Sequence, residues 1–209
     1  MPRGLFIALE GIDGAGTTTM AYSLGEYLTK RGIDTITTFE PWTSVFGKEL
    51  RRRLASEKEA NSNGLDFLRL FIEDSAVHNR ELIKPALSKN KIVISDRYRA
   101  SSFAYQQVQG ISLEQIMRMH EEKDLEFPSL TFYLDLKVEQ ALRRKGGGTE
   151  KFETFDFLSK VENYYRKLIE INLKYLGHVI IVDVNPPQEE VKSNIFKSFE
   201  EFYKDYLKS

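Results

Sequence analysis

The sequence predicts an α/β fold of three layers, α/β/α, in which helices cover both faces of a five-stranded parallel sheet. Five short runs of β-branched and aromatic residues are apolar almost without interruption, as in strands that are buried on both faces. Segments of helical length separate these runs, and this alternation gives parallel strands joined by right-handed crossovers. The expected strands cover residues 5–9, 35–39, 92–94, 130–134 and 179–182.

The expected helices follow from the spacing of apolar residues between the strands. The long helical segments are residues 18–31, 65–87 and 154–176. One face of the last segment carries apolar residues at three- or four-residue spacing, namely Leu158, Val161, Tyr165 and Leu168. Ligands of such sheets bind outside the carboxyl ends of the strands, so the residues that follow each strand are the candidates for function.

Length and composition narrow the class of protein. The 209 residues suit a single domain, 1–209, with a substantial core. The formal net charge of −1 excludes a strongly basic protein that coats duplex nucleic acid, and we expect no nucleic-acid partner. No apolar stretch reaches the roughly 18 residues of a membrane span. The chain has no cysteine, which excludes disulfides and thiolate metal sites and favours a reducing compartment, the cytoplasm.

A glycine-rich segment follows the first expected strand and precedes a helix. Gly11, Gly14 and Gly16 let successive backbone N–H groups turn toward one point, and the following helix directs the positive end of its dipole there. Such a nest binds the phosphates of a nucleotide, and Thr18 stands where a P-loop hydroxyl binds Mg²⁺. For the glycines alone, a tight turn is the alternative. The expected phosphate-binding residues are Gly11, Ile12, Asp13, Gly14, Ala15, Gly16, Thr17, Thr18 and Thr19.

Thr17 occupies the position that holds lysine in the standard P-loop. That lysine brings a positive charge to the β- and γ-phosphates and stabilises charge in the transition state. Threonine supplies a hydroxyl and no charge. Either another cation substitutes for the lysine, or the protein binds nucleotide without turning it over.

A second polar segment follows the third expected strand. Asp96 stands at the tip of this strand, beside the P-loop, as the acidic residue that holds Mg²⁺ does in P-loop enzymes. Arg97 can bind a phosphate through two parallel hydrogen bonds. An isolated Asp–Arg pair is more often a local salt bridge, so this interpretation depends on the residues around it.

Those surrounding residues carry a family pattern. Asp96-Arg97-Tyr98 is followed by Ser101-Ser102 and Ala104-Tyr105-Gln106, and the P-loop contains Glu10-Gly11, Asp13-Gly14 and Gly16. Further matches are Glu40-Pro41, Leu70-Phe71 with Asp74 and His78, Ile83-Lys84-Pro85-Ala86-Leu87, Leu130-Thr131-Phe132-Tyr133-Leu134-Asp135 and Lys151-Phe152-Glu153. With these motifs the chain resembles the thymidylate kinase family over almost its whole length.

The resemblance implies a fold of the P-loop nucleoside monophosphate kinase type and an activity. The enzyme would transfer a phosphoryl group from ATP to dTMP, giving dTDP and ADP for dTTP synthesis. Mg²⁺ would be its cofactor, held by Thr18 and Asp96. The resemblance also implies a homodimer, formed through long amphipathic helices such as residues 65–87.

The resemblance assigns an acceptor site as well. Phe71 would stack on the thymine ring, Gln106 would bind the pyrimidine edge, and Tyr105 would pack near C2′ and disfavour a ribose hydroxyl. Asp13 would accept from the 3′-hydroxyl, and Arg97 would hold the acceptor phosphate. The full expected set is Asp13, Glu40, Phe71, Arg97, Ser101, Ser102, Tyr105 and Gln106. The alternatives are a core phenylalanine for Phe71 and a helix-surface amide for Gln106.

Three positions near this site depart from the family pattern. Ser75 stands where the helix of Phe71 usually has an arginine, and Phe39 replaces the usual arginine before Glu40-Pro41. Trp42 begins a segment that is often rich in glycine. These departures leave open another acceptor, such as dUMP or a further pyrimidine nucleotide. The missing P-loop lysine also leaves open a pseudokinase that binds nucleotide without transfer.

A basic, glycine-rich segment lies between two helical segments, at residues 143–151. A solvated linker is the usual interpretation of such a run. In the family, however, a lid in this place closes over the donor phosphates, and we expect one at about 143–153. Its cations could replace the missing lysine. The expected catalytic residues are therefore Arg97, Arg143, Arg144 and Lys151.

Overall fold

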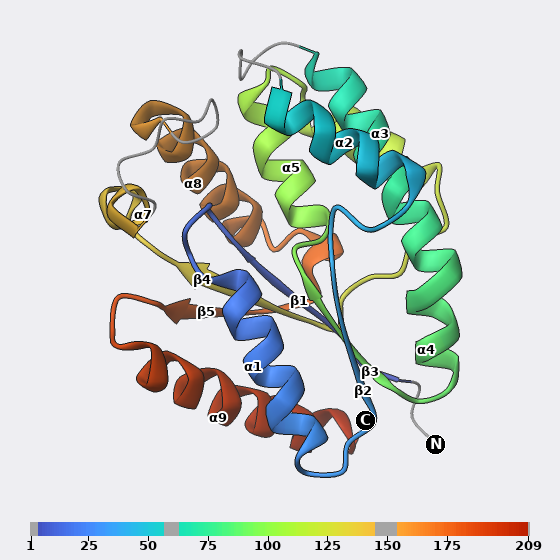
Figure 1. Ribbon diagram of the computed structural model, residues 1–209, viewed down its shortest axis with the longest axis vertical. Coiled ribbons are helices and arrows are strands. Elements are labelled where there is room, and N and C mark those ends of the chain that lie inside the picture. The colour runs from blue at the N-terminus through green and yellow to red at the C-terminus, as the bar shows by residue number, and fades with distance from the viewer. Residues whose placement is uncertain (1–3, 57–62, 145–153, 209) are drawn as a thin grey trace.

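Five parallel strands form one sheet in the order β2-β3-β1-β4-β5, which puts β1 at the centre (Figure 1). The computed structural model describes residues 4–56, 63–144 and 154–208. The strands are β1 (Phe6–Gly11), β2 (Thr35–Phe39), β3 (Ile92–Asp96), β4 (Leu130–Asp135) and β5 (His178–Asp183). The predicted α/β fold with a five-stranded parallel sheet is confirmed, and the strand ends lie within two residues of the predicted ones.

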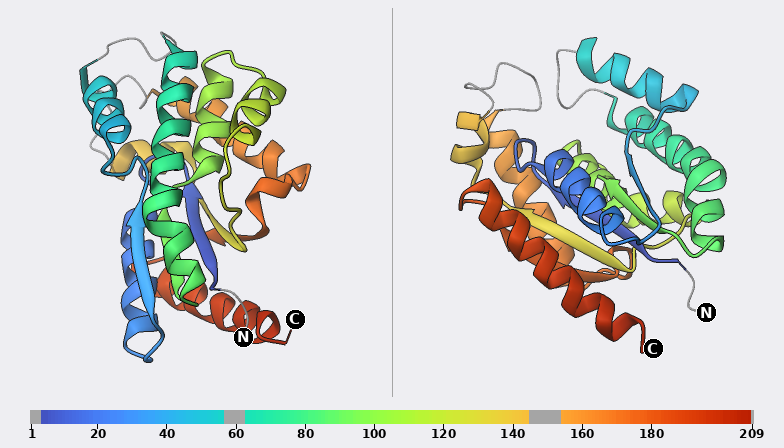
Figure 2. Two further views of the ribbon diagram at one scale, coloured as in Figure 1. Left: turned by 90° about the vertical axis from the view of Figure 1, so that its right-hand side faces the viewer. Right: turned by 60° about the horizontal axis from the view of Figure 1, so that its bottom comes forward.

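The direction of each crossover decides which face a helix covers. The chain moves from β1 to β2 through α1 (Thr17–Thr29), whereas every later step runs across the sheet in the opposite direction. Right-handed connections therefore place α1 on one face and the intervening helices on the other. The last helix, α9 (Gln188–Tyr206), returns to pack against α1 and β5, as Figures 1 and 2 show.

The elements between β2 and β5 build the second face and the edge above it. They are α2 (Val45–Ser56), α3 (Gly64–His78), a π-helical turn η1 (Asn79–Ile83), α4 (Lys84–Ser88), α5 (Arg99–Val108), α6 (Leu113–Glu121), α7 (Val138–Arg144), α8 (Phe155–Glu170) and the 3₁₀ turn η2 (Lys174–Leu176). The helix predicted at 65–87 is thus α3, η1 and α4 in succession. No helix in the described ranges combines the length and the apolarity that crossing a membrane requires.

The core lies on both faces of the central strand. Ile7 and Leu9 of β1 belong to the main apolar cluster, whereas Phe6 and Ala8 pack with Leu87 and its neighbours on α4. Successive residues of a strand point to opposite faces, so this alternation buries β1 completely. The carboxyl end of β1 is therefore held rigidly where the glycine-rich loop begins.

Two expectations about the elements need correction. The strands at the two edges are not covered on both faces, since Ile181 of β5 is 55% exposed and Thr38 is the one buried residue of β2. The helix predicted at 154–176 ends at Glu170, because Asn172 adopts a left-handed conformation with φ of 48°. The predicted apolar stripe of this helix is confirmed, and all four of its residues are buried.

Candidate active site

The segment between β1 and α1 forms a cradle of the predicted kind. Gly14 and Gly16 have φ angles of 88° and 91°, a left-handed conformation that favours glycine. Gly16 precedes the first turn of α1, which contains Thr17, Thr18 and Thr19. The N–H groups of a first helical turn have no partner within the helix, and they lie at the positive end of its dipole. This geometry suits the phosphates of a nucleotide.

The predicted metal-binding pair comes together across two neighbouring strands. β1 and β3 are adjacent with Leu9 in register with Asp96, so the loop after β1 lies beside the end of β3. The Thr18 hydroxyl donates a hydrogen bond to Asp96 Oδ2. Asp96 Oδ1 is buried and has no hydrogen-bond partner in the part of the chain that the structure describes. An unpaired carboxylate oxygen beside a hydroxyl suits Mg²⁺, which prefers oxygen ligands.

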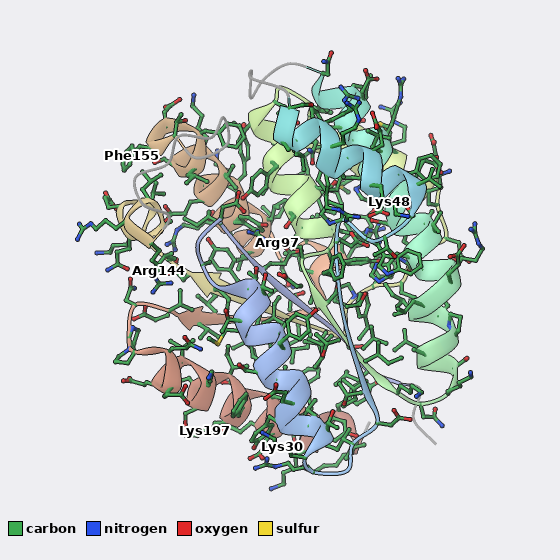
Figure 3. The ribbon with its side chains drawn as sticks, viewed as in Figure 1. Lys30, Lys48, Arg97, Arg144, Phe155 and Lys197 are labelled. Atoms are coloured by element: carbon green, nitrogen blue, oxygen red, sulfur yellow. The ribbon has the colours of Figure 1, made fainter. Side chains whose placement is uncertain are left out.

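Arg97 lies near the centre of the molecule, between the cradle and α5 (Figure 3). Its φ of 68° is rare for a residue with a side chain, and such strained residues concentrate at functional sites. Its guanidinium donates to Asp13 Oδ1 at 2.8 Å, to the Tyr165 hydroxyl at 3.2 Å and to the Gly11 carbonyl oxygen. Because a guanidinium stays charged, Arg97 brings a fixed positive charge to the edge of the cradle.

Arg144 closes a cavity of about 320 Å³ on the α7 side of the cradle (Figure 3). Its guanidinium donates to the Val184 carbonyl oxygen at 2.6 Å and to the Gly14 carbonyl oxygen at 3.3 Å, so it joins α7 to the loop after β5 and to the cradle. The cavity is lined by Gly14, Ala15, Gly16, Thr19, Met20, Arg144, Val184, Pro186, Gln188 and Val191.

A larger pocket of about 440 Å³ has Arg97 in its wall and opens between α2, α3 and α5. Its wall contains seven of the eight predicted acceptor residues. The lining residues are Asp13, Glu40, Pro41, Arg51, Leu54, Ala55, Phe67, Phe71, Arg97, Tyr98, Ser101, Tyr105, Gln106 and Gln109. Asp13 also belongs to the cradle, so a ligand in this pocket would lie next to bound phosphates.

Comparison with known proteins decides the family. The family profile described as thymidylate kinase matches residues 9–195. A probable thymidylate kinase of Archaeoglobus fulgidus is 37% identical over 203 residues, which cover 95% of this chain and 96% of that protein. The thymidylate kinase of Brachyspira hyodysenteriae is 34% identical, and the alignment covers 95% of each chain. The chain belongs to the thymidylate kinase family. The resemblance inferred from the motifs is therefore confirmed, and the chain is a nucleoside monophosphate kinase.

One buried polar atom in the pocket wall has no hydrogen-bond partner among the described residues. It is Gln106 Oε1, and Gln106 is only 2% exposed. The other end of the Gln106 amide donates to Gln109 Oε1 at 3.3 Å. Buried polar atoms are normally hydrogen-bonded, so an unpaired atom beside a pocket indicates where a ligand group binds. In this thymidylate kinase it lies on α5, and Phe71 lines the same pocket.

Ser102 is the predicted acceptor residue that does not line the pocket. Its side chain is buried, and its Oγ lies 2.8 Å from Nε2 of His120 on α6. Successive residues of a helix point in directions about 100° apart, so Ser101 faces the pocket while Ser102 faces away from it. The structure gives no support to an acceptor role for Ser102, and we leave it out of the proposed site.

Two of the departures from the thymidylate kinase pattern, Ser75 and Trp42, belong to a network around Glu40 and His78. Ser75 donates to Glu40 Oε2 at 2.8 Å, and His78 Nδ1 lies 3.0 Å from Glu40 Oε1. Burial raises the pKa of Glu40, although the contact with His78 opposes this rise. The Trp42 ring stacks on His78 with 5.0 Å between centroids and does not line the pocket. Ser75 therefore fixes Glu40, and Trp42 supports the network from outside the pocket.

Arg51 is a pocket residue that the sequence did not identify. Its Nη1 donates to the Trp42 carbonyl oxygen at 2.8 Å and to the Pro41 carbonyl oxygen, which holds the guanidinium in the pocket wall. The only signal in the sequence is the run Arg51-Arg52-Arg53. Which of three consecutive arginines faces the pocket depends on how α2 packs against α3, and the sequence does not show this.

Glu10 is a second residue that sequence reasoning did not place in the site. It is 1% exposed at the end of β1, and it accepts hydrogen bonds from Ser101 Oγ at 2.6 Å, Tyr98 N at 2.9 Å and the Tyr165 hydroxyl at 3.0 Å. Burial raises the pKa of Glu10 to about 7, although the Arg97 charge and these hydrogen bonds lower it. Glu10 thus joins the cradle to α5 and α8.

The lid predicted at about 143–153 is described only at its first two residues. Arg143 and Arg144 end α7, and both side chains are exposed. Arg144 contacts the cradle, whereas Arg143 makes no hydrogen bond or ion pair with any residue that the structure describes. Lys151 lies outside the described residues.

Proposed function

We propose that this thymidylate kinase transfers the γ-phosphoryl group of ATP to dTMP, giving dTDP and ADP for dTTP synthesis. The observation that carries the proposal is the position of Asp13 and Arg97, which are hydrogen-bonded to each other between a phosphate cradle and a pocket for a nucleotide. Phosphoryl transfer requires donor and acceptor to meet in line, and two adjacent sites of this kind provide that arrangement.

The donor side takes ATP. Its phosphates bind the backbone of residues 11–19, and its adenosine part occupies the cavity closed by Arg144. Thr18 and Asp96 hold Mg²⁺, which neutralises charge on the β- and γ-phosphates when it is bound. The unpaired Asp96 Oδ1 supports this assignment.

The base of dTMP lies in the pocket between α2, α3 and α5. The ring of Phe71 stacks on thymine, and the Gln106 amide bonds to the pyrimidine edge, where Oε1 accepts from the N3–H of thymine. Tyr105 fills the space near C2′ and disfavours a ribose hydroxyl. Gln106 Oε1 lacks a hydrogen-bond partner among the described residues, which leaves it free to bind a ligand.

The sugar and phosphate of dTMP lie nearer to the cradle. Asp13 accepts from the 3′-hydroxyl, and Ser101 and Glu40 line the pocket wall. Arg97 and Arg51 supply the positive charge that the acceptor phosphate requires. Arg51 brings a cation to this pocket, whereas the usual arginine of α3 is replaced by Ser75, which is buried and bonded to Glu40.

The chemistry needs positioning and charge neutralisation more than a general base. The attacking atom is a phosphate oxygen that is already anionic, so no proton has to be removed before attack. Arg97 is hydrogen-bonded in place before substrates bind, which is how preorganised groups stabilise developing charge. Arg144 and Lys151 of the lid complete the proposed set of cations, since Thr17 brings no charge to the P-loop. Arg143 is left out of this set, because only Arg144 of the two contacts the cradle.

The test is ADP formation from Mg·ATP with dTMP, dUMP, UMP, CMP or no acceptor. We expect dTMP to be turned over fastest and the ribonucleotides slowest, because Tyr105 opposes the 2′-hydroxyl. Asp96→Asn, purified in the same way, controls for contaminating kinases. Faster turnover of dUMP than of dTMP would identify dUMP as the acceptor in place of dTMP. Saturable Mg·ATP binding without turnover of any nucleotide would identify the protein as a pseudokinase.

Three further proposals rest on the length of the chain, on its lack of cysteine and on the family resemblance. The chain is one domain, 1–209, with its lid at about 143–153; it forms a homodimer; and it works in the cytoplasm. Analytical ultracentrifugation of the full chain checks the second assignment, for which we expect a particle of twice the chain mass. A single species with the mass of one chain would contradict the homodimer without affecting the proposed reaction.

A further inference from the structure

Arg99 carries a buried positive charge that the proposed reaction does not use. It is the first residue of α5, it is 2% exposed, and it does not line the nucleotide pocket. Its Nε and Nη1 atoms are buried and have no hydrogen-bond partner among residues 4–56, 63–144 and 154–208. Arginine is rarely buried unless it is paired, so an arginine with two unpaired nitrogen groups requires an explanation.

The neighbours of the Arg99 guanidinium are aromatic rings. The guanidinium carbon, Cζ, lies 4.6 Å from the ring centroid of Tyr175 and 5.2 Å from that of Phe127. The two rings stack on each other at 5.4 Å. Ring faces attract a cation, but they do not accept its in-plane N–H groups, which remain unsatisfied.

A second unpaired nitrogen lies in the wall of the same cavity. The cavity has a volume of about 430 Å³ between α5, the end of α6 and η2, and both Arg99 and His120 line it. His120 is fully buried, its Nε2 lies 2.8 Å from Ser102 Oγ, and its Nδ1 has no partner among the described residues. When the Ser102 hydroxyl donates to Nε2, the ring proton is on Nδ1, and Nδ1 becomes a donor.

The described carboxylates at the rim form no ion pair with Arg99. Glu121 accepts from Lys174 at 3.2 Å and from the Tyr175 hydroxyl. Lys123 pairs with Glu73 at 2.7 Å, and Asp124 pairs with Lys84. Glu122, which also lines the cavity, is exposed to solvent. Within the described residues no carboxylate lies within salt-bridge distance of the Arg99 guanidinium.

We propose that this cavity is a binding site for an oxyanion, a carboxylate or phosphate group held between the Arg99 guanidinium and the N–H of His120. A guanidinium and a neutral imidazole donor suit such a group, because both donate and neither accepts in this tautomer. The Phe127 ring, 47% exposed, stands at the mouth of the cavity. Burial and the nearby Arg99 charge hold the pKa of His120 well below its usual range, consistent with a neutral ring.

The site is distinct from the active site but close to it along the chain. Arg97, Tyr98 and Ser101 line the nucleotide pocket, whereas Arg99 and His120, which is bonded to Ser102, line the second cavity. One turn of α5 thus carries residues of both sites. Inorganic phosphate can also bind in the phosphate cradle, so the experiment must report the two cavities separately.

The three histidines of the chain provide separate reporters. His120 lies in the proposed site, His78 contacts Glu40 beneath the nucleotide pocket, and His178 is an exposed residue of β5. The imidazole resonances of ¹⁵N-labelled full-length protein are followed by NMR during titration with sodium phosphate and, separately, with sodium acetate. We expect a saturable shift of His120 with a Kd of about 1 mM or tighter for the anion that the site takes.

Arg99→Met tests the assignment, and Arg118→Met is its matched control. Methionine has a long, unbranched side chain that packs well against aromatic rings, so Arg99→Met removes the charge with little loss of packing. Arg118 is an exposed arginine two residues before His120, so its replacement removes the same charge outside the cavity. We expect Arg99→Met to abolish the His120 shift and Arg118→Met to retain it. If Arg99→Met does not fold, Arg99→Lys is used, and its affinity should fall at least about tenfold because the planar fork is lost.

Three results would overturn the site. The first is the absence of a saturable His120 shift with either anion in the wild-type protein. The second is a shift that persists unchanged in Arg99→Met. The third is a shift that Arg118→Met removes to the same extent. Saturation with phosphate alone, or with acetate alone, supports the site and identifies the group that it takes.

Discussion

Glu10 holds a carboxyl group in a place that water does not reach. Its three hydrogen-bond donors come from the start of α5 and from α8, and Arg97 lies nearby. The carboxyl is nevertheless 1% exposed, and the desolvation of its charged form outweighs these contacts. Its pKa rises from 4.5 to about 7 in the folded protein.

This shift predicts a pH dependence of stability. The folded state binds the Glu10 proton more tightly than the unfolded state. The protonated carboxyl therefore contributes to the free energy of unfolding, and this contribution is fully present below the pKa of the unfolded state. It is lost as pH rises through about 7. Glu10→Gln mimics the protonated form, and the two hydroxyl partners can reverse their hydrogen bonds. Between pH 5 and pH 8 the variant should therefore gain up to about 3 kcal/mol of unfolding free energy relative to the wild-type protein.

Urea unfolding at several pH values measures this difference. Glu49→Gln is the control, because Glu49 is an exposed carboxylate paired with Arg52, and its pKa is lowered rather than raised. The difference in unfolding free energy between Glu49→Gln and the wild-type protein should stay constant over the same pH range. Parallel pH curves for the wild-type protein and Glu10→Gln would contradict the assigned shift.

Single residues also show how far the sequence could predict the site. The contact between Thr18 and Asp96 was predictable, because both follow strands that end at the same edge of a parallel sheet. The orientations of Ser102 and Arg51 were not, because each depends on the face that its helix turns toward a neighbour. A motif fixes which residues are near the site, whereas packing between helices fixes which of them enter it.

Among the elements, the cradle and α7 pack backbone against backbone. A Cβ atom added to Gly14 would lie 3.0 Å from the carbonyl oxygen of Ala141 and 3.2 Å from its Cα. Gly14 also has a φ of 88°. The glycine therefore serves two purposes, since it permits the left-handed turn and lets α7 approach the loop.

Gly14→Ala should separate the cradle from α7. The left-handed conformation alone costs an alanine about 1–2 kcal/mol of unfolding free energy, and the contact with Ala141 adds to that. Because the shift occurs in the phosphate-binding loop, we expect the Kd for Mg·ATP to rise at least about tenfold, or ~1.4 kcal/mol. Isothermal titration calorimetry and chemical unfolding measure the two effects.

Gly32→Ala is the matched control for the cost of placing an alanine in the left-handed backbone conformation. Gly32 has a φ of 77°, but a Cβ atom there would meet nothing within 4 Å, and the residue lies far along the chain from the cradle. This variant should lose stability without a change in Mg·ATP affinity. Equal affinities for Gly14→Ala and the wild-type protein would show that the approach of α7 does not shape the nucleotide site.

The elements themselves were largely predictable. Continuous apolar runs identified all five strands, and the stripe on α8 identified its buried face. The exposed edge strands were not predicted, because an apolar run does not reveal the position of its strand in the sheet. The end of α8 was also missed, since the left-handed Asn172 stops the helix within a segment that still contains apolar residues.

At the scale of the whole molecule, the sheet brings cations from distant parts of the chain to one edge. Arg97 follows β3, Arg144 ends the helix after β4, and Arg51 comes from α2. The P-loop itself contributes Thr17 in place of a lysine. In the proposed mechanism the charge that stabilises phosphoryl transfer thus comes from several parts of the fold, and Arg144 of α7 is the cation among the described residues that lines the proposed donor cavity.

Arg144 should therefore matter much more than its neighbour. Arg144→Ala removes the guanidinium that reaches Gly14 and Val184, and we expect kcat to fall by more than about tenfold, or ~1.4 kcal/mol. Arg143→Ala is the matched control. It removes the same charge from an exposed position without a hydrogen bond to any described residue, and it should change kcat by less than about threefold, or ~0.7 kcal/mol. Steady-state kinetics with Mg·ATP and dTMP compare the two variants.

A rescue experiment separates charge from packing. If Arg144 acts through its charge, Thr17→Lys in the Arg144→Ala background places an ammonium group at the usual P-loop position and should restore part of kcat. If Arg144 acts only by joining α7 to Val184, the added lysine has nothing to replace, and the double variant stays as slow as Arg144→Ala. Equal losses in Arg143→Ala and Arg144→Ala would contradict the assignment, because two cations that differ in their contact with the cradle would then contribute alike.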